Sequence, residues 1–268
     1  MSNIIFVAVV AAALRIEYVL ALFFTRKIRK EWNENRVRLF SVRVVCFTHA
    51  LLSSIGCLGS LFTDSNFLQD PYHYQAIPAE YVFLFSTGYF IYDLCDMYFH
   101  GELEASKEYL VHHSLVISAF VAFLLTGKLY GLALVGLLVE VQTVFLHSRT
   151  MALLVYGSQN MPKYVDYIIN ANMICLFLFR HAPICYLLFN LLFRNQPISI
   201  FFKVFLIGGL TFLEYHNIHL TMSVAESDGF FGYERKELDE DSIDPLGSVR
   251  KDEQEIEKNQ KRSTNKIN

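Results

Sequence analysis

The chain has 268 residues, of which 53% are hydrophobic and 15% are aromatic, and its mean hydropathy is +0.32. This composition is more apolar than that of a soluble domain of similar length, so it favours an integral membrane protein. The net charge is only −3, and the sequence contains neither a nucleic-acid motif nor a glycine-rich phosphate loop. A nucleic-acid partner is therefore not expected.

Seven stretches approach the length of about 20 apolar residues that a membrane-spanning helix needs. They cover residues 3–24, 41–62, 81–99, 109–127, 130–155, 165–192 and 199–222. Hydropathy predicts six or seven spans, because several stretches carry charged residues, among them Arg15 and Glu17 in the first. That first stretch lacks a basic leader and stays apolar through Leu22, so we interpret it as an uncleaved span and not as a signal peptide.

Basic residues crowd the loop after the first stretch: Arg26, Lys27, Arg29, Lys30, Arg36 and Arg38. The positive-inside rule predicts that this loop is cytosolic and that the amino terminus faces the lumen or exterior. The alternative is that the loop attracts anionic lipid headgroups. After about residue 223 the sequence becomes polar, and we expect residues 228–268 to form a disordered cytosolic tail.

The third stretch contains STGYFIYDLCDM, in which four polar residues recur at helical spacing. Tyr89, Tyr92, Asp93 and Asp96 should share one face of the helix, and that face should point into the bundle. An ionisable group within a span costs about 2.5–3.5 kcal/mol and usually has a partner. The four residues predict either a functional site or a hydrogen-bonded brace between helices.

The fourth stretch begins with KEYLVHHSLVISAF, where His112 and His113 are adjacent in an apolar context. Successive helical residues point about 100° apart, so both rings can border one cavity only at the edge of a helix. A polar pocket and a pair of hydrogen-bonded core histidines remain the two interpretations. General base catalysis or acyl transfer to an imidazole is the chemistry that such a pair offers.

Later stretches add more buried polar residues. Glu140 lies in LLVEVQTVFLHSR, and Arg180 precedes Pro183, which should kink its helix. A buried arginine needs an acidic partner, for which Glu140 and Glu214 are the two candidates. No metal site and no cofactor are expected, because the chain has no HExxH motif and its five cysteines form no CxxC pair.

The motifs taken together resemble the TLC-domain family, which includes translocating-chain-associated and Lag-type proteins. The stretches that carry the resemblance are GYFIYDLCDM (88–97), KEYLVHHSLVISAF (107–120), LLVEVQTVFLHSR (137–149) and LFLFR (176–180). The resemblance implies an all-helical bundle of about six transmembrane helices around a lipid-facing tunnel, preceded here by one extra helix. It divides the chain into an N-terminal helix and basic loop (1–33), a TLC domain (34–227) and the tail.

The resemblance also implies a function. The branch in question is similar to small TLC-domain proteins that limit the incorporation of long-chain polyunsaturated fatty acids into phospholipids, which makes membranes more rigid. It implies a plasma-membrane location, with the endoplasmic reticulum as the alternative. In the ceramide synthases of the family, the paired histidines serve acyl transfer from acyl-coenzyme A, and His112 and His113 occupy that place here. After the histidines, however, the chain departs from the full Lag motif.

We therefore expect a regulator of membrane lipid composition whose partners are membrane lipids, with acyl-coenzyme A or fatty acyl chains as ligands. The expected catalytic residues, if there is catalysis, are His112, His113, Asp93 and Asp96. The expected substrate-binding residues are Tyr89, Tyr92, Glu140 and Arg180. Two alternatives remain: a ceramide-synthase-like acyltransferase, and a membrane accessory subunit whose polar residues only brace the helices.

Overall fold

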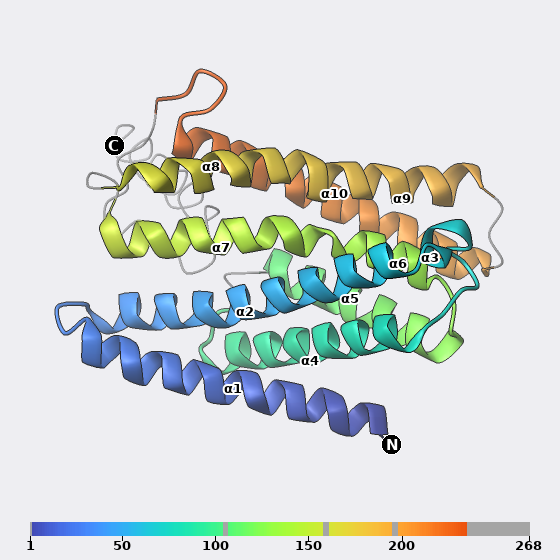
Figure 1. Cartoon of the computed structure of the whole chain (residues 1–268), viewed down its shortest axis with the longest axis horizontal. Helices are drawn as coiled ribbons and strands as arrows, with labels where there is room; N and C mark the ends of the chain where they lie inside the picture. Colours follow the sequence, from blue (N-terminus) through green and yellow to red (C-terminus); the bar gives the residue numbers. More distant parts are fainter. Residues whose placement is uncertain (1, 104–106, 158–160, 195–197, 235–268) are drawn as a thin grey trace, which may run out of the picture.

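The computed structural model describes residues 2–103, 107–157, 161–194 and 198–234, and every regular element within them is a helix. The elements are α1 (Ser2–Ile28), α2 (Glu34–Thr63), α3 (Asn66–Gln69), α4 (Ile77–Phe99), α5 (Lys107–Thr126), α6 (Tyr130–Leu137), α7 (Val139–Tyr156), α8 (Lys163–Leu176), η1 (Phe177–His181), α9 (Ala182–Phe193) and α10 (Ile200–Asp228). Because α6 runs into α7, and α8 runs through η1 into α9, the long helices form rods that match the seven predicted stretches (Figure 1). The prediction of an all-helical membrane bundle is confirmed. From residue 235 onward the predicted tail lies outside the described residues.

Five helical segments of the described chain are long and apolar enough to cross a membrane: Asn3–Ile28, Glu34–Thr63, Lys107–Thr126, Tyr130–Tyr156 and Lys163–Phe193. Helices α4 and α10 have 23 and 29 residues, which is sufficient length, but they are not apolar enough for the same criterion. Both nevertheless pack alongside these segments, and both carry buried polar residues, among them Asp96 and Asn217.

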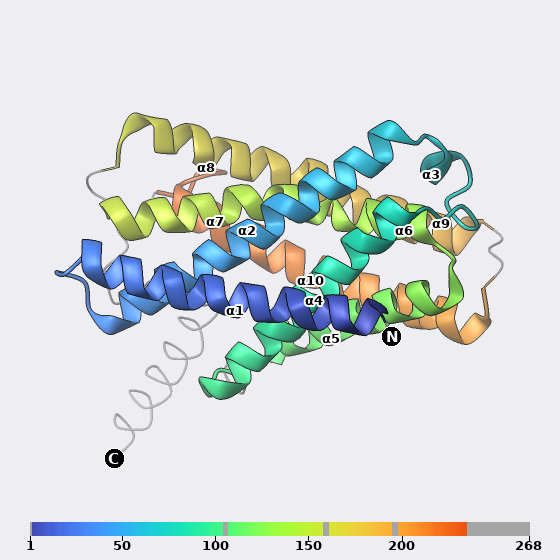
Figure 2. The same cartoon turned by 60° about the horizontal axis from the view of Figure 1, so that its bottom comes forward.

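The rods form a ring with one helix outside it. Going round the ring, α2 packs against α4, α4 against α5, α5 against α10, α10 against α9 and α8, α8 against α7, and α7 against α2. Helix α6 fills the space between α2, α4, α5 and α9 at one end of this ring. Helix α1 packs against α2 and α4 and lies across their outer side (Figure 2). The extra N-terminal helix that the resemblance implied is therefore an outer helix beside the ring.

Two features fasten α1 to the ring. Gly88 of α4 lets α1 approach closely, since a Cβ atom there would lie 2.8 Å from Cγ1 of Val10. The charges that make the first span impure are also paired: Arg15 Nη1 lies 3.0 Å from Oδ1 of Asp96, and Glu17 accepts a hydrogen bond of 2.5 Å from Thr48. Charged residues in an apolar helix are tolerated here because neighbouring helices supply partners.

The loop between α2 and α4 closes the end of the ring where α6 begins. The backbone N–H of Leu129 donates to the carbonyl of Tyr72 over 2.9 Å. Gly131 packs so closely on this loop that a Cβ atom would lie 2.0 Å from the carbonyl oxygen of Phe67. The hydroxyl of Tyr72 donates to Asn190 of α9 over 3.3 Å, so the loop is tied to two rods. This end of the ring is sealed by tightly packed backbone.

The helix that contains Pro183 is irregular where the sequence predicts a kink. Residues Phe177–His181 form a π-turn, η1, and the N–H of Ala182 donates to the carbonyl of Phe177. Proline cannot donate to the residue four positions earlier, and insertion of an extra residue into the turn accommodates that loss. Helices α8 and α9 continue as one rod through η1 (Figure 1).

Candidate functional site

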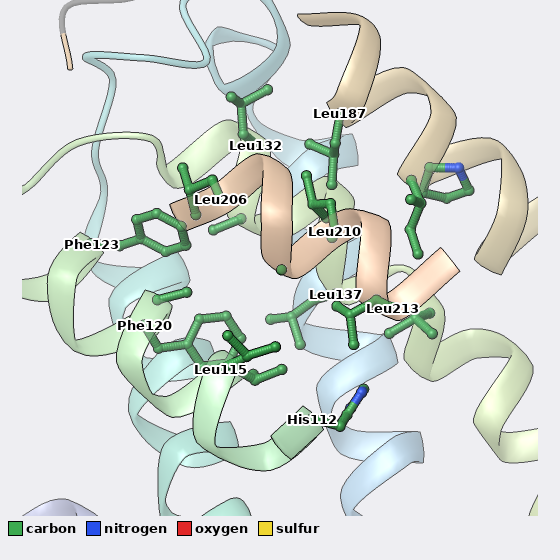
Figure 3. A pocket seen from close by; sticks show the side chains of 18 of the residues that line it. His112, Leu115, Phe120, Phe123, Leu132, Leu137, Leu187, Leu206, Leu210 and Leu213 are labelled. Carbon is green, nitrogen blue, oxygen red and sulfur yellow. The ribbon is translucent and has the colours of Figure 1, made fainter. Parts of the chain in front are cut away.

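An apolar cavity lies inside the ring, between α5, α6, α9 and α10. Its volume is about 150 Å³, the size of an apolar protein cavity that holds one benzene molecule. Leucine and phenylalanine side chains converge on it from all four helices (Figure 3). Those labelled in the figure are Leu115, Phe120, Phe123, Leu132, Leu137, Leu187, Leu206, Leu210 and Leu213. An apolar cavity of this kind takes hydrocarbon in preference to water.

One end of the cavity is polar. His112 of α5, Glu140 of α7, Arg180 of η1 and Asn217 of α10 line it there, each from a different element. The opposite end, near Leu129, is apolar and lies beneath the sealed loop. The cavity is therefore amphipathic, with a long apolar wall and one small polar end.

Arg180 is 8% exposed, and its guanidinium group is only partly bonded. Nη1 donates to Oδ1 of Asn217 and Nη2 donates to the hydroxyl of Thr143, each over 3.1 Å. Nε of Arg180 and Nδ2 of Asn217 are buried without a hydrogen-bond partner. Two donors at the polar end of the cavity thus lack an acceptor from the protein.

Of the two acids expected to pair with Arg180, Glu140 lines the same cavity and Glu214 does not. Glu214 binds His181 instead, with its Oε1 2.6 Å from Nδ1 of that ring. Oε2 of Glu140 lies 3.8 Å from Nδ1 of His49 in α2. Within the described part of the chain, no carboxylate lies within 4.0 Å of the Arg180 guanidinium nitrogens. The arginine has neutral hydrogen-bond partners, and Glu140 acts on it electrostatically without a direct contact.

The two histidines face different surroundings. His112 lines the cavity, and its Nδ1 is buried without a hydrogen-bond partner. His113 does not line the cavity; its Nδ1 lies 3.3 Å from Oδ2 of Asp93, within ion-pair distance but without hydrogen-bond geometry. The ring of His113 also packs on Phe90, with centroids 5.1 Å apart. Of the pair, His112 is the one that a ligand in the cavity would touch.

The four residues predicted to share a face of α4 do not form one site. Asp96 lies away from the cavity in an ionic cluster, where it pairs with Arg15 and with Arg38 Nη2 at 3.3 Å. Tyr89 and Tyr92 are buried but do not line the cavity either. Tyr89 stacks on His49 with centroids 3.7 Å apart. Tyr89 and Asp96 thus connect α4 to neighbouring helices, and Asp93 contacts His113 beside the cavity.

Sequence reasoning missed Asn217 as a site residue. A signal was present, since Leu206, Leu210, Leu213 and Asn217 recur at three- and four-residue steps and share one helical face. A polar residue at the end of an apolar stripe points to the polar end of a pocket. The two glycines of the cavity wall, Gly136 and Gly209, gave no such signal, because their role depends on which helices face them.

The chemistry open to this arrangement follows from its parts. The apolar wall can hold a hydrocarbon chain, and the polar end offers donors from Arg180 and Asn217 and an imidazole from His112. Among the described residues, no group of three or more His, Cys, Asp or Glu side chains is placed to hold a metal ion.

Comparison with known proteins agrees with this architecture. The family profile of the TLC domain matches residues 39–225. TLC domain-containing protein 1 of Gallus gallus is 36% identical over 146 residues, which is 54% of this chain and 56% of that protein. The human protein of the same name is 33% identical over 174 residues, 64% of this chain and 68% of its own length. TLC domain-containing protein 2 of Danio rerio is 28% identical over 212 residues, 78% of this chain and 82% of its own length.

The matched segment thus spans little more than half of the chicken relative, whereas the domain profile covers the whole ring from the first turns of α2 to the last turn of α10. The cavity and all four residues of its polar end lie inside the profile, and α1 lies outside it. The chain is a multi-pass membrane protein, and it belongs to the TLC-domain family.

Proposed function

We propose that this protein regulates membrane phospholipid composition by limiting the incorporation of long-chain polyunsaturated fatty acids, so that membranes stay more rigid. The observation that carries the proposal is the amphipathic cavity, because its apolar wall and single polar end suit one acyl chain with a polar group at its end. Membership of a family with a lipid-related role, together with the resemblance to fluidity-regulating members, supports it. We place the activity at the plasma membrane, with the endoplasmic reticulum as the alternative.

Turnover is not needed for this function. A protein that holds an acyl chain in its cavity lowers the amount available to acylating enzymes in the same membrane. In this role the expected substrate-binding residues are Arg180 and Glu140, which line the polar end. Tyr89 and Tyr92 support the bundle around them through their burial between helices.

The orientation that we propose follows from the basic loop. The connection between α1 and α2, which carries Arg29 and Lys30, lies at the same end of the bundle as the last turns of α7 and α10 (Figure 1). With this end in the cytosol, the sealed end of the cavity lies toward the opposite face of the membrane.

The test fills the cavity without disturbing the backbone. A Cβ atom at Gly209 would meet only Leu115, at 3.7 Å, so Gly209→Leu projects into the cavity. Gly208→Leu is the matched control, because a Cβ atom at that exposed position meets nothing within 4 Å. Cells that lack the protein are given labelled polyunsaturated fatty acid, and its incorporation into phospholipid is measured after rescue with each variant at equal abundance. Gly208→Leu should restore the limit and Gly209→Leu should not. Full restoration by Gly209→Leu would refute a role for the cavity.

A second function, acyl transfer, is favoured by one observation: His112 borders the cavity directly beside the Asp93–His113 pair. A ceramide-synthase-like acyltransferase would use this imidazole to move an acyl group from acyl-coenzyme A to an amine or a lysophospholipid, with release of the coenzyme A thiol. Purified protein tested with labelled acyl-coenzyme A and a panel of acceptors should form labelled product if this is the function, and His112→Ala should abolish it. Lack of product and of acyl-enzyme across the panel would eliminate the transferase.

A further inference from the structure

The polar end of the cavity is built around donors that lack acceptors. Arg180 and Asn217 are 8% and 4% exposed, and Nε of the first and Nδ2 of the second are buried without a hydrogen-bond partner. A buried donor left unpaired costs about 1–3 kcal/mol, and more when the group is charged. Their natural partner is a group with two acceptor oxygens, since an arginine and a carboxylate form parallel hydrogen bonds.

The charge at the polar end of the cavity also favours an anionic ligand. Arg180 has no carboxylate within 4.0 Å of its guanidinium nitrogens in the described chain, and its two bonded partners, Asn217 and Thr143, are neutral. Glu140 lines the cavity too and acts on Arg180 electrostatically, but it makes no contact with the guanidinium group within 4.0 Å. A buried cation whose nearest acid makes no direct contact is stabilised by an anion that hydrogen-bonds to it.

The dimensions limit the size of that anion. Along α10, the cavity wall runs from Phe205 to Asn217, which at the helical rise is about 18 Å. This length is close to the roughly 15 Å that one leaflet of hydrocarbon occupies. The volume of about 150 Å³ and the burial of Arg180 leave no space at the polar end for a nucleotide or a phosphoester headgroup, and the same volume encloses only the carboxyl end and first part of a long acyl chain.

From these three observations we infer that the cavity binds an unesterified fatty acid, with its carboxylate on Arg180 and Asn217 and its hydrocarbon chain along the apolar wall. This inference rests on the proposed function and names its ligand: the protein withholds free fatty acid before it is activated to a thioester. Coenzyme A thioesters and phospholipids, whose acyl carbonyls are uncharged, are then poor ligands.

The test uses the full-length protein in nanodiscs and a photoactivatable fatty acid that carries a terminal alkyne. Competitors are a polyunsaturated fatty acid, its methyl ester and its coenzyme A thioester. In the wild-type protein the acid should compete about 10–100-fold better than the ester, as expected for hydrogen bonds to a charged group. Equal or better competition by the ester or the thioester would overturn the inference, and this comparison needs no variant.

Single substitutions test which residues bind the carboxylate of the fatty acid. Arg180→Gln should remove the preference for acid over ester, and Glu140→Gln should tighten binding of the acid because a like charge is lost. The control is Arg149→Gln, which removes another buried arginine; Arg149 binds Asp228 away from the cavity, so this change should leave the preference intact. A preference that survives Arg180→Gln would overturn the assignment.

The inference and the proposed function fail separately. If the thioester or a phospholipid competes best while Gly209→Leu still loses the limit on incorporation, the fatty acid inference falls and the function stands. If the wild-type protein does not restore the limit on incorporation, the proposed function falls whichever ligand binds.

Discussion

The unequal surroundings of the two histidines predict unequal costs of their removal. His113→Ala should lower the free energy of unfolding much more than His112→Ala does. His113 lies 3.3 Å from Asp93 and packs on Phe90, whereas His112 borders the cavity and its Nδ1 has no hydrogen-bond partner to lose.

The size of the difference follows from these contacts. His113 is buried, is charged only if protonated and makes no hydrogen bond to Asp93, so its removal should cost about 1–3 kcal/mol, as for a buried polar group that loses its neighbour, and not the cost of a broken ion pair. Asp93 keeps 16% of its side chain exposed, so part of that cost is relieved by solvent or lipid headgroups. Adding the lost packing against Phe90, we expect about 3 kcal/mol for His113→Ala. His112→Ala only widens an existing cavity and should cost about 1 kcal/mol.

The assay is reversible unfolding of the purified protein in mixed micelles, with a double-mutant cycle as the control. In an Asp93→Asn background, His113→Ala should cost clearly less, because no buried carboxylate loses its partner. In cells, the effect of His113→Ala on the incorporation of labelled polyunsaturated fatty acid into phospholipid should then be proportional to the loss of folded protein. Equal destabilisation by the two single substitutions, or no coupling between His113 and Asp93, would refute the division of roles.

Three further outcomes are expected. Gly209→Leu should raise the thermal unfolding midpoint even as it blocks the cavity. The substitution removes a helical glycine, which costs about 1 kcal/mol, and it buries new apolar area. A lower midpoint would mean that the cavity cannot accept the side chain. Gly88→Leu should lower the unfolding free energy by about 1–3 kcal/mol, since the new Cβ atom would lie 2.8 Å from Val10 of α1. The loop after α1 should then become more accessible to protease. Unchanged proteolysis would show that α1 is not held against Gly88. Tyr74 donates a hydrogen bond to Asp64 in the loop before α4, and this bond holds the pKa of Asp64 below its usual value of about 3.9. The bond therefore stabilises the fold above that pH, and its contribution is lost as the pH falls through the lowered pKa. Tyr74→Phe should accordingly weaken the fall of the thermal unfolding midpoint at acid pH. An unchanged fall would contradict the role of this hydrogen bond.

The long helices could be predicted from the sequence, but the rotation of each helix about its own axis could not. Apolar length located every long helix, and the helical spacing of Asp93 and Asp96 placed both toward the interior. Residues three apart still differ by about 60° around a helix, and in a ring this is enough to give them different neighbours. Asp93 accordingly meets α5 through His113, while Asp96 meets α1 and α2 through two arginines. The neighbouring helices decide which of the two inward-facing carboxylates lies near the site. The local sequence pattern of α4 does not show which helices are its neighbours.

Arg180 shows the same limit at one residue. Its burial could be predicted from an apolar context, but a choice between Glu140 and Glu214 as its partner required the local geometry of η1. The π-turn spreads two consecutive residues onto different partners: Arg180 reaches Thr143 and Asn217 at the cavity, and the next residue, His181, binds Glu214. A regular α-helix would shift this register. Pro183, which deprives the turn of one backbone hydrogen bond, thus favours the conformation that leaves the arginine at the cavity without a carboxylate in direct contact. The irregular helix and the unpaired donors are two aspects of one arrangement, since local rules of helix and charge pairing are most often broken where a protein binds something.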